Sequence, residues 1–372
     1  MPRCHVGKVW TRAAILTGLI LQMVPGLPSP ARAAVQVQFQ PGAGADFAAR
    51  AGLDLPRLQA QMQAELDNLF QTYRLSDYLR AFGDAQSFTT RGMGVDYASN
   101  FKAVMVGISG NLSLNVEKGY LPEGTRTQPP AGGMAPNATV MAGVNLDVIG
   151  IAPICLYVNY FNRRATIDDD FSADLSNFGV HAQLKLFGPK DSGLMDAVIQ
   201  WGGLDITSGF ERSNLGMTLK QGFRRNVPVG MAPQGGGSVA IDLNTTGQFR
   251  MNARTLSVPL ELTTNFRLLY LLSLYGGMGF DWQLGGGSDM TIDLDGGMVG
   301  VTPAAGGQPP MRIDVGTVAI DATDSVDPSA GRLRWLLGAQ LNVLIVRLFV
   351  QLNLATQDPV LASVALGLRL AF

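Results

Sequence analysis

The sequence predicts an all-β protein: a closed antiparallel transmembrane β-barrel of about 10–14 strands with an N-terminal helical or plug segment. Three observations lead to this fold class. Charged residues make up only 15% of the chain and hydrophobic residues 47%, which disfavours a soluble protein with a well-solvated surface. Apolar residues recur at every second position along segments of about ten residues or more, the length at which a tilted strand crosses a bilayer. The chain also begins with an export signal.

The first 33 residues form the predicted signal peptide. Arg3, Lys8 and Arg12 precede a short apolar stretch, and Ala31 to Ala33 provide the small residues of a cleavage site. An apolar stretch of about twelve residues is too short to span a bilayer as a helix. We therefore expect the mature chain to leave the cytoplasm and to begin near Ala34.

The apolar tracts have the periodicity of strands. From Trp335 to Val343, apolar side chains alternate with positions that include Gln340 and Asn342. A strand places such a set on one face, whereas a helix would scatter it around its surface. The same alternation predicts strands near 101–117, 138–149, 154–163, 178–188, 198–210, 255–264, 267–283, 333–343, 347–356 and 360–372.

Two further pairs of strands are predicted more weakly, and the second pair carries many Asp residues. They lie near 215–224 with 238–249, and near 289–299 with 311–321. Because Asp is unfavourable in contact with lipid, we expect these pairs to be hairpins that stand above the membrane.

A secreted β-sandwich is the alternative, since its strands also alternate. Sandwich strands are usually near five or six residues long and charged on their exposed faces, but the polar face here is mostly Ser, Asn, Gln, Gly and Thr. On the apolar face, Tyr160, Trp282 and Trp335 lie at one set of strand ends, and Phe266 and Phe372 at the other. Two aromatic girdles are typical of membrane interfaces and favour the barrel.

The last strand carries a more specific pattern. Val364, Leu366, Leu368 and Leu370 alternate up to a terminal aromatic residue, Phe372. Together with the signal peptide and the other strands, this pattern resembles that of the bacterial outer-membrane β-barrel superfamily. The resemblance implies a location in the outer membrane of a Gram-negative-type bacterium and contact with outer-membrane lipid. It also implies that the barrel-assembly machinery reads these five residues as an assembly signal.

The predicted organisation is a signal peptide (1–33), a helical or plug segment (34–100) and the barrel (101–372). Within the barrel, long Gly- and Pro-rich links predict outer loops, and short links predict periplasmic turns. The predicted turns are Gly150–Pro153, Thr263–Phe266 and Leu344–Val346.

The segment before the barrel contains a predicted helix. Apolar residues repeat at three- and four-residue steps from Leu55 to Tyr73, and Asp54 is placed to cap the first turn. One interpretation is a periplasmic helix packed over the mouth of the barrel, through which residues 54–73 would contact an envelope protein. The other is a plug inside the lumen.

Residues for catalysis or metal binding are scarce. The mature chain keeps only Cys155 and His181 of its Cys and His residues, and the strand phase directs His181 inward. Asp168 to Asp170 form an acidic run without the ligand order of a calcium loop. The net charge of −1 provides no basic surface for nucleic acid. We expect no enzyme activity, no cofactor, no metal and no nucleic-acid partner.

The polar phase of the strands predicts the lining of the lumen. Because its charges are sparse and of both signs, strong ion selectivity is not expected. We predict a porin-like channel or passive transporter for small solutes of amphipathic or hydrophobic character. The alternative is a non-conducting structural or surface-complex barrel that acts through its outer loops or N-terminal helix. The candidate lumen-lining residues are Glu117, Asp147, Lys185, Glu261, Asp281, Gln340, Asn342, Arg347, Gln351, Asn353 and Arg369.

Overall fold

Twelve antiparallel strands form one sheet in the part of the chain that the structure, a computed structural model, describes. The described residues are 34–50, 54–72, 74–98, 101–117, 131–188, 198–231, 238–302, 311–356 and 360–372, all within one unit of the chain, Arg32–Phe372. The predicted signal peptide lies outside the described residues, and so does Tyr73.

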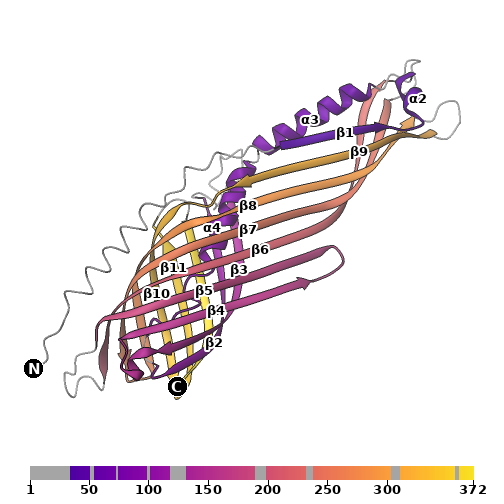
Figure 1. Ribbon diagram of the computed structural model, residues 1–372. Helices are drawn as coiled ribbons and strands as arrows, with labels where there is room; N and C mark the ends of the chain where they lie inside the picture. Colours follow the sequence, from indigo (N-terminus) through magenta and orange to yellow (C-terminus); the bar gives the residue numbers. More distant parts are fainter. Residues whose placement is uncertain are drawn as a thin grey trace, which may run out of the picture. The chain divides into compact units, whose positions relative to one another are not determined.

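The sheet order is β1-β9-β8-β10-β11-β12-β2-β3-β4-β5-β6-β7, and β7 also pairs with β8. All strands except β1 and β9 therefore close into a ring, and β9 and β1 extend the sheet beyond it (Figure 1). The strands are β1 Ala34–Pro41, β2 Val104–Val116, β3 Gly132–Asn145, β4 Ile154–Thr166, β5 Phe171–Phe187, β6 Ile199–Met231, β7 Ser238–Leu268, β8 Leu272–Thr302, β9 Met311–Val326, β10 Gly331–Val343, β11 Val346–Ala355 and β12 Val360–Ala371.

The outer wall of the ring is apolar and its interior is polar. On β12, Val364 and Leu366 are exposed, whereas Ser363 and Arg369 are buried. The same alternation on the neighbouring strands follows from the two-residue period of a strand. A closed ring leaves no unpaired sheet edge in hydrocarbon. The chain is thus an outer-membrane β-barrel, as the sequence predicts.

The two ends of the ring differ in their links. At the turn end, β10 and β11 are joined by Leu344 and Ile345, and Leu344 has the positive φ of 54° that a tight hairpin requires. The β7–β8 turn lies at residues 269–271 rather than at the predicted Thr263–Phe266, because the strand pairing continues to Leu268 opposite Leu272. Phe372 lies at the same end. The opposite end, the loop end, carries the longer strands and links.

Three strands extend far beyond the ring at the loop end. β6, β7 and β8 have 33, 31 and 31 residues, and their loop-end parts include three of the four segments of the two predicted hairpins. The weak segments do stand above the ring, but they are continuations of ring strands and, in β9, a strand that pairs outside it.

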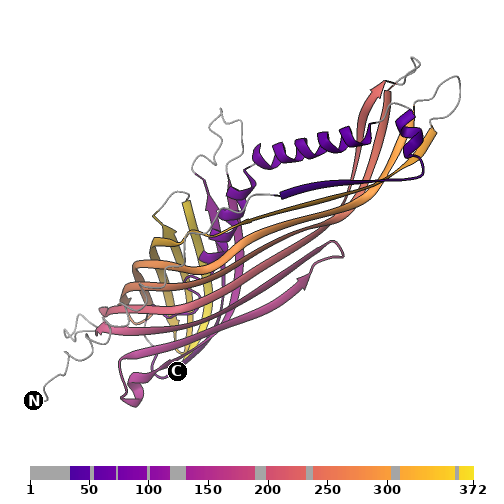
Figure 2. The same cartoon turned by 45° about the horizontal axis from the view of Figure 1, so that its top comes forward.

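The N-terminal helix packs on this extension. α3 (Leu55–Thr72) begins as predicted, since Asp54 Oδ1 accepts a hydrogen bond of 3.1 Å from the Arg57 backbone N–H. Its Leu58 is buried against Val37 of β1 and Ile241 of β7. The sequence leaves open a helix packed over the mouth of the barrel and a plug inside the lumen. In the structure α3 lies in neither place but beside β1 and β9, as Figure 2 shows. Strand β1 itself was not predicted.

Two further helices complete the described part of the chain: α2 (Ala45–Arg50) and α4 (Leu75–Phe88). A single 3-10 turn, η1 (Leu146–Ile149), links β3 and β4. None of the described helices is both long and apolar enough to span a membrane.

Candidate functional site

The interior of the ring is occupied by Leu75 to Ala98, here called the inner segment, which consists of α4 and the residues that follow it. Every residue from Ala81 to Ala98 is buried. The segment begins at the loop end, where Arg74 pairs with Glu117 at the end of β2. It leads to the turn end, where the Ala103 backbone N–H donates to the Phe372 carbonyl over 2.6 Å. The chain therefore passes through the ring from the loop end to the turn end.

Glycines allow the inner segment to fit closely. A Cβ on Gly133 of β3 would lie 2.4 Å from backbone atoms of Ala81 and Phe82, so only glycine permits this contact with α4. Gly92 has a φ of 82°, a conformation that favours glycine, and it packs against the side chain of Gln351.

Arg91 of the inner segment lies at the centre of a buried charge network. Its guanidinium is ion-paired with Glu211 of β6 and lies 3.1 Å from Asp281 Oδ1 of β8. It also donates to Ser257 Oγ over 3.0 Å. Thr90 Oγ1 donates to Glu211 over 2.6 Å. Three ring strands thus hold one turn of the inner segment.

Arg334 of β10 continues this network. Its Nε donates to Asp281 Oδ2 over 2.9 Å, and its Nη2 is ion-paired with Glu261 of β7. Tyr97 of the inner segment donates its hydroxyl proton to Glu261 over 3.0 Å, and Arg334 also donates to Asn353 over 2.9 Å. Buried charges are tolerated only when they are paired and hydrogen-bonded, and these are.

Two further arginines bind the inner segment near its ends. At the loop end, Arg332 Nη2 lies 2.5 Å from Asp84 Oδ2. At the turn end, Arg369 donates to the Val95 carbonyl over 2.6 Å and stacks 3.7 Å above the Phe349 ring centroid.

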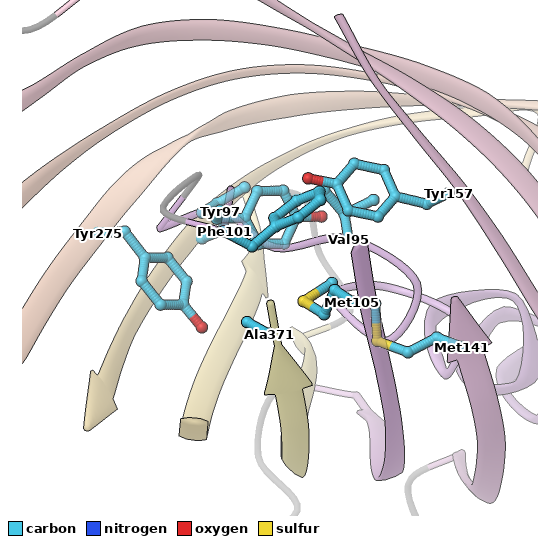
Figure 3. Close-up of a cluster of buried hydrophobic side chains, with 9 residues drawn as sticks. Val95, Tyr97, Phe101, Met105, Met141, Tyr157, Tyr275 and Ala371 are labelled. Atoms are coloured by element: carbon cyan, nitrogen blue, oxygen red, sulfur yellow. The ribbon is translucent and has the colours of Figure 1, made fainter. Parts of the chain in front are cut away.

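An apolar cluster fills the turn end of the ring. Figure 3 shows that it joins inner-segment and ring side chains, and its buried members are Val95, Tyr97, Phe101, Met105, Met141, Tyr157, Tyr275, Leu336 and Ala371.

His181 of β5 points into the ring, as its strand phase predicts. It is buried, with Nε2 3.3 Å from Asn159 Oδ1 and 3.6 Å from Glu211 Oε1.

Across the described residues, no group of three or more His, Cys, Asp and Glu side chains is arranged to hold a metal ion. Asp168 caps its own turn by accepting hydrogen bonds from the Asp170 and Phe171 backbone N–H groups.

Most of the predicted lumen residues are in the interior. Glu117, Lys185 and Arg347 are half-buried, the first beside Arg74. Asp147 is exposed in η1, because the 3-10 turn interrupts the strand alternation on which its prediction rested. The remaining predicted residues are buried within the ring: Glu261, Asp281, Gln340, Asn342, Gln351, Asn353 and Arg369.

Several members of the network were missed in the sequence. Arg334 directly precedes the outward-facing Trp335, so the alternation of the strand could have placed Arg334 on the inward face. Glu211 directly follows a predicted strand that in the structure continues through it. No periodic signal marks Arg91, Asp84 and Asp96, because they belong to a segment without a repeat.

An apolar pocket of about 580 Å³ lies on the loop-end side of the inner segment. One wall is the face of α4, and the other walls come from the loop end of β3 and from the middle of β7 and β8. It contains no charged side chain. Its lining residues are Leu75, Tyr78, Leu79, Phe82, Gly132, Gly133, Met134, Phe249, Met251, Met290 and Ile292.

Comparisons with solved structures find bacterial barrels at low identity. The translocator domain of the autotransporter NalP from Neisseria meningitidis is 11% identical, covering 89% of this chain and 100% of that one, with a TM-score of 0.30. A Pseudomonas aeruginosa FadL homologue is 9% identical over 79% and 98%, with a TM-score of 0.26. The Yersinia pestis attachment invasion locus protein Ail is 12% identical over 73% and 99%, with a TM-score of 0.22.

No curated protein sequence matches the chain significantly. The profile of one sequence family does match, and it covers residues 38–372, which include the inner segment and every strand of the ring. The chain therefore belongs to the Lsa36-like family.

Proposed function

We propose that this protein is a passive outer-membrane transporter for small hydrophobic or amphipathic solutes, in which the inner segment acts as a plug. The observation that carries the proposal is the apolar pocket, because a concave apolar site with few polar groups is the usual form of a small-molecule site. Its position matters as much as its lining. A solute in the pocket touches Tyr78 and Phe82 of α4, so it contacts the segment that fills the ring.

Binding in the pocket can be tested with a fluorescent alkyl probe added to the protein in lipid nanodiscs. Phe249 and Ile292 are half-buried lining residues on adjacent strands. Replacing both, Phe249→Gln with Ile292→Gln, should weaken probe binding roughly tenfold, since each change puts a polar group on an apolar wall. Arg250→Gln changes an exposed neighbour and is the matched control. Equal affinity in the double variant and the wild type would contradict the proposal.

Transport can be tested in liposomes with an alkyl sulfonate, an amphipathic solute that crosses lipid slowly. We expect uptake by the wild-type protein and faster uptake, with higher conductance, when residues 34–100 are deleted. The deleted chain must first be shown to form a barrel, for example by resistance of its strands to protease. Background uptake by both folded proteins would exclude a transport function.

A second candidate function is a non-conducting surface barrel, and the paired interior charges favour it. Breaking a buried ion pair costs about 3–5 kcal/mol, so a plug held by Arg91, Arg332 and Arg369 is costly to release. In that case an envelope protein should be recovered by crosslinking from cysteines placed on the exposed face of α3. A barrel that conducts with its ion pairs intact would exclude this candidate.

A further inference from the structure

The seam between β3 and β4 is the shortest in the ring. Its pairing runs only from Val140 opposite Tyr160 to Asn145 opposite Cys155. By contrast, β2 pairs with β3 over the full length of β2, and β4 pairs with β5 as far as Thr166. Above Val140, the described residues 132–139 of β3 and 161–166 of β4 have no ladder between them. Figures 1 and 2 both show the two strands separating towards the loop end.

Side chains, not strand pairing, close the base of this gap. Asn177 of β5 reaches past β4 and donates from Nδ2 to the Ala138 carbonyl and to Asn137 Oδ1, each over 2.6 Å. Thr139 Oγ1 donates to Asn177 Oδ1 over 3.0 Å. Each such hydrogen bond makes only a small net contribution to stability, because the groups also hydrogen-bond to water when they separate. Opening the base of the gap therefore costs far less than separating a complete pair of strands.

One side of the gap has an apolar, exposed outer wall. The outward side chains of β2 and β3 stay apolar beside it, with Leu112, Leu114 and Met134 at 45%, 43% and 57% exposure. On β4 the outward residues beyond Tyr160 are the exposed Asn162 and Arg164. Tyr160 is the kind of residue that lies at the membrane interface. The gap thus begins at the level of the interface, with an apolar wall on its β3 side.

The apolar pocket meets the same edge. Gly132, Gly133 and Met134, the upper end of β3, line it together with Tyr78 and Phe82 of α4. Met134 is exposed on the outer wall and also lines the pocket. An apolar path therefore leads around the unpaired edge of β3 from the lipid-facing wall to α4.

We propose that the pocket exchanges its ligand sideways with the outer leaflet, through the gap between the upper parts of β3 and β4. The ligand class is an apolar molecule or alkyl chain dissolved in the bilayer. The idea rests on the proposed function in so far as the pocket binds an apolar solute. It adds the route: the ligand enters from the membrane and not along the axis of the ring.

The test is to close the gap with a covalent crosslink, here called the lock. In a Cys155→Ala background, Ala138→Cys with Asn162→Cys is bridged across the gap by a short bifunctional maleimide. The matched control is Ala138→Cys with Gly110→Cys, since Gly110 is the β2 partner of Ala138 on a fully paired seam. Two photoreactive alkyl probes are compared in vesicles, one dissolved in the bilayer and one supplied from water by a soluble headgroup. Labelling of the α4 peptide is measured by mass spectrometry.

We expect the lock to slow labelling by the bilayer probe roughly tenfold, as closure of a gate would. The water-borne probe and the control bridge should show little change. If the crosslink does not change labelling by the bilayer probe, the lateral route is wrong and the proposed function still stands. Equal loss with both probes would also overturn it, because the bridge would then block the pocket generally. Absence of α4 labelling in the unlocked protein would refute both proposals.

Discussion

Arg369 of β12 and Asp96 of the inner segment form an ion pair inside the ring, with 3.3 Å between Nη1 and Oδ1 and both side chains fully buried. The pair joins the last strand of the chain to the segment that immediately precedes the first strand of the ring. Closure of the ring and placement of the inner segment are thus linked at one point.

This pair predicts a large stability effect. Arg369→Gln removes the guanidinium from this buried ion pair, which should lower the free energy of unfolding by about 3–5 kcal/mol. Arg312→Gln is the control, because Arg312 pairs with Asp242 over 2.7 Å with its own side chain 65% exposed, and such pairs contribute about 0–1 kcal/mol. Urea unfolding in lipid vesicles measures both. Similar losses in the two variants would show that the buried pair has no special role.

The glutamines of α3 are predicted to protect the open edge of β1. Gln63 Oε1 accepts from the Val37 backbone N–H over 3.0 Å and its Nε2 donates to the Val35 carbonyl over 2.7 Å; Gln59 donates to the Val37 carbonyl over 2.8 Å. An uncapped sheet edge pairs readily with another chain. Gln63→Ala should therefore accelerate amide exchange at Val37 and promote self-association, measured by hydrogen exchange and light scattering. The exposed Gln61→Ala should do neither.

Asp324 of β9 predicts a pH dependence at the start of α4. Burial raises the pKa of its carboxyl above the usual 3.8, although hydrogen bonds from the Ser325 N–H and the Ser76 hydroxyl oppose the shift. A raised pKa means that protonation favours the folded state. The resulting stability is complete below pH 3.8 and is lost as the pH rises through the raised value.

The matching variant is Asp324→Asn, which cannot ionise. The melting temperature of the wild type relative to this variant should fall as the pH is raised from about 3.5 to 7. A difference between the two proteins that is constant over this range would show that the Asp324 carboxyl titrates normally.

Phe372 is predicted to matter through its backbone as well as its ring. Its N–H donates to the Val104 carbonyl over 2.8 Å and its carbonyl accepts from the Ala103 N–H, so it closes the β12–β2 seam. Deleting Phe372 should reduce the assembled fraction in cells more than Phe372→Ala, which keeps these bonds and loses only the aromatic side chain. Heat-modifiable migration on gels measures assembly. Equal defects would mean that only the aromatic ring, the group that the assembly machinery is expected to read, matters.

The path of the inner segment predicts that α3 lies outside the cell. Short turns of outer-membrane barrels face the periplasm and long extensions face outwards, and α3 lies with the loop-end extension. In a Cys155→Ala background, Gln61→Cys should react with an impermeant maleimide on intact cells, whereas Asp147→Cys, exposed in the η1 turn, should react only after lysis. The reverse pattern would place α3 in the periplasm.

Local periodicity explains what could be predicted. The alternation along β12 or β10 depends only on neighbouring residues, because one face of the strand meets lipid and the other does not. The alternation of polar and apolar residues along the strands was therefore enough to place Glu261, Asn353 and Arg369 in the interior. It failed for Asp147, where the strand gives way to a 3-10 turn.

By itself, the sequence determined the all-β class, the lipid-facing wall, the N-cap of α3 and the inward phase of His181. The tertiary structure decided which strands close the ring, where Ala81 to Ala98 are buried and which carboxylates the three arginines Arg91, Arg334 and Arg369 contact. The physical reason is the separation along the sequence of the residues that determine each feature. Strand alternation is imposed residue by residue by the surrounding solvent. The pairing of Arg91 with Glu211, 120 positions apart, exists only once the ring has closed around the inner segment.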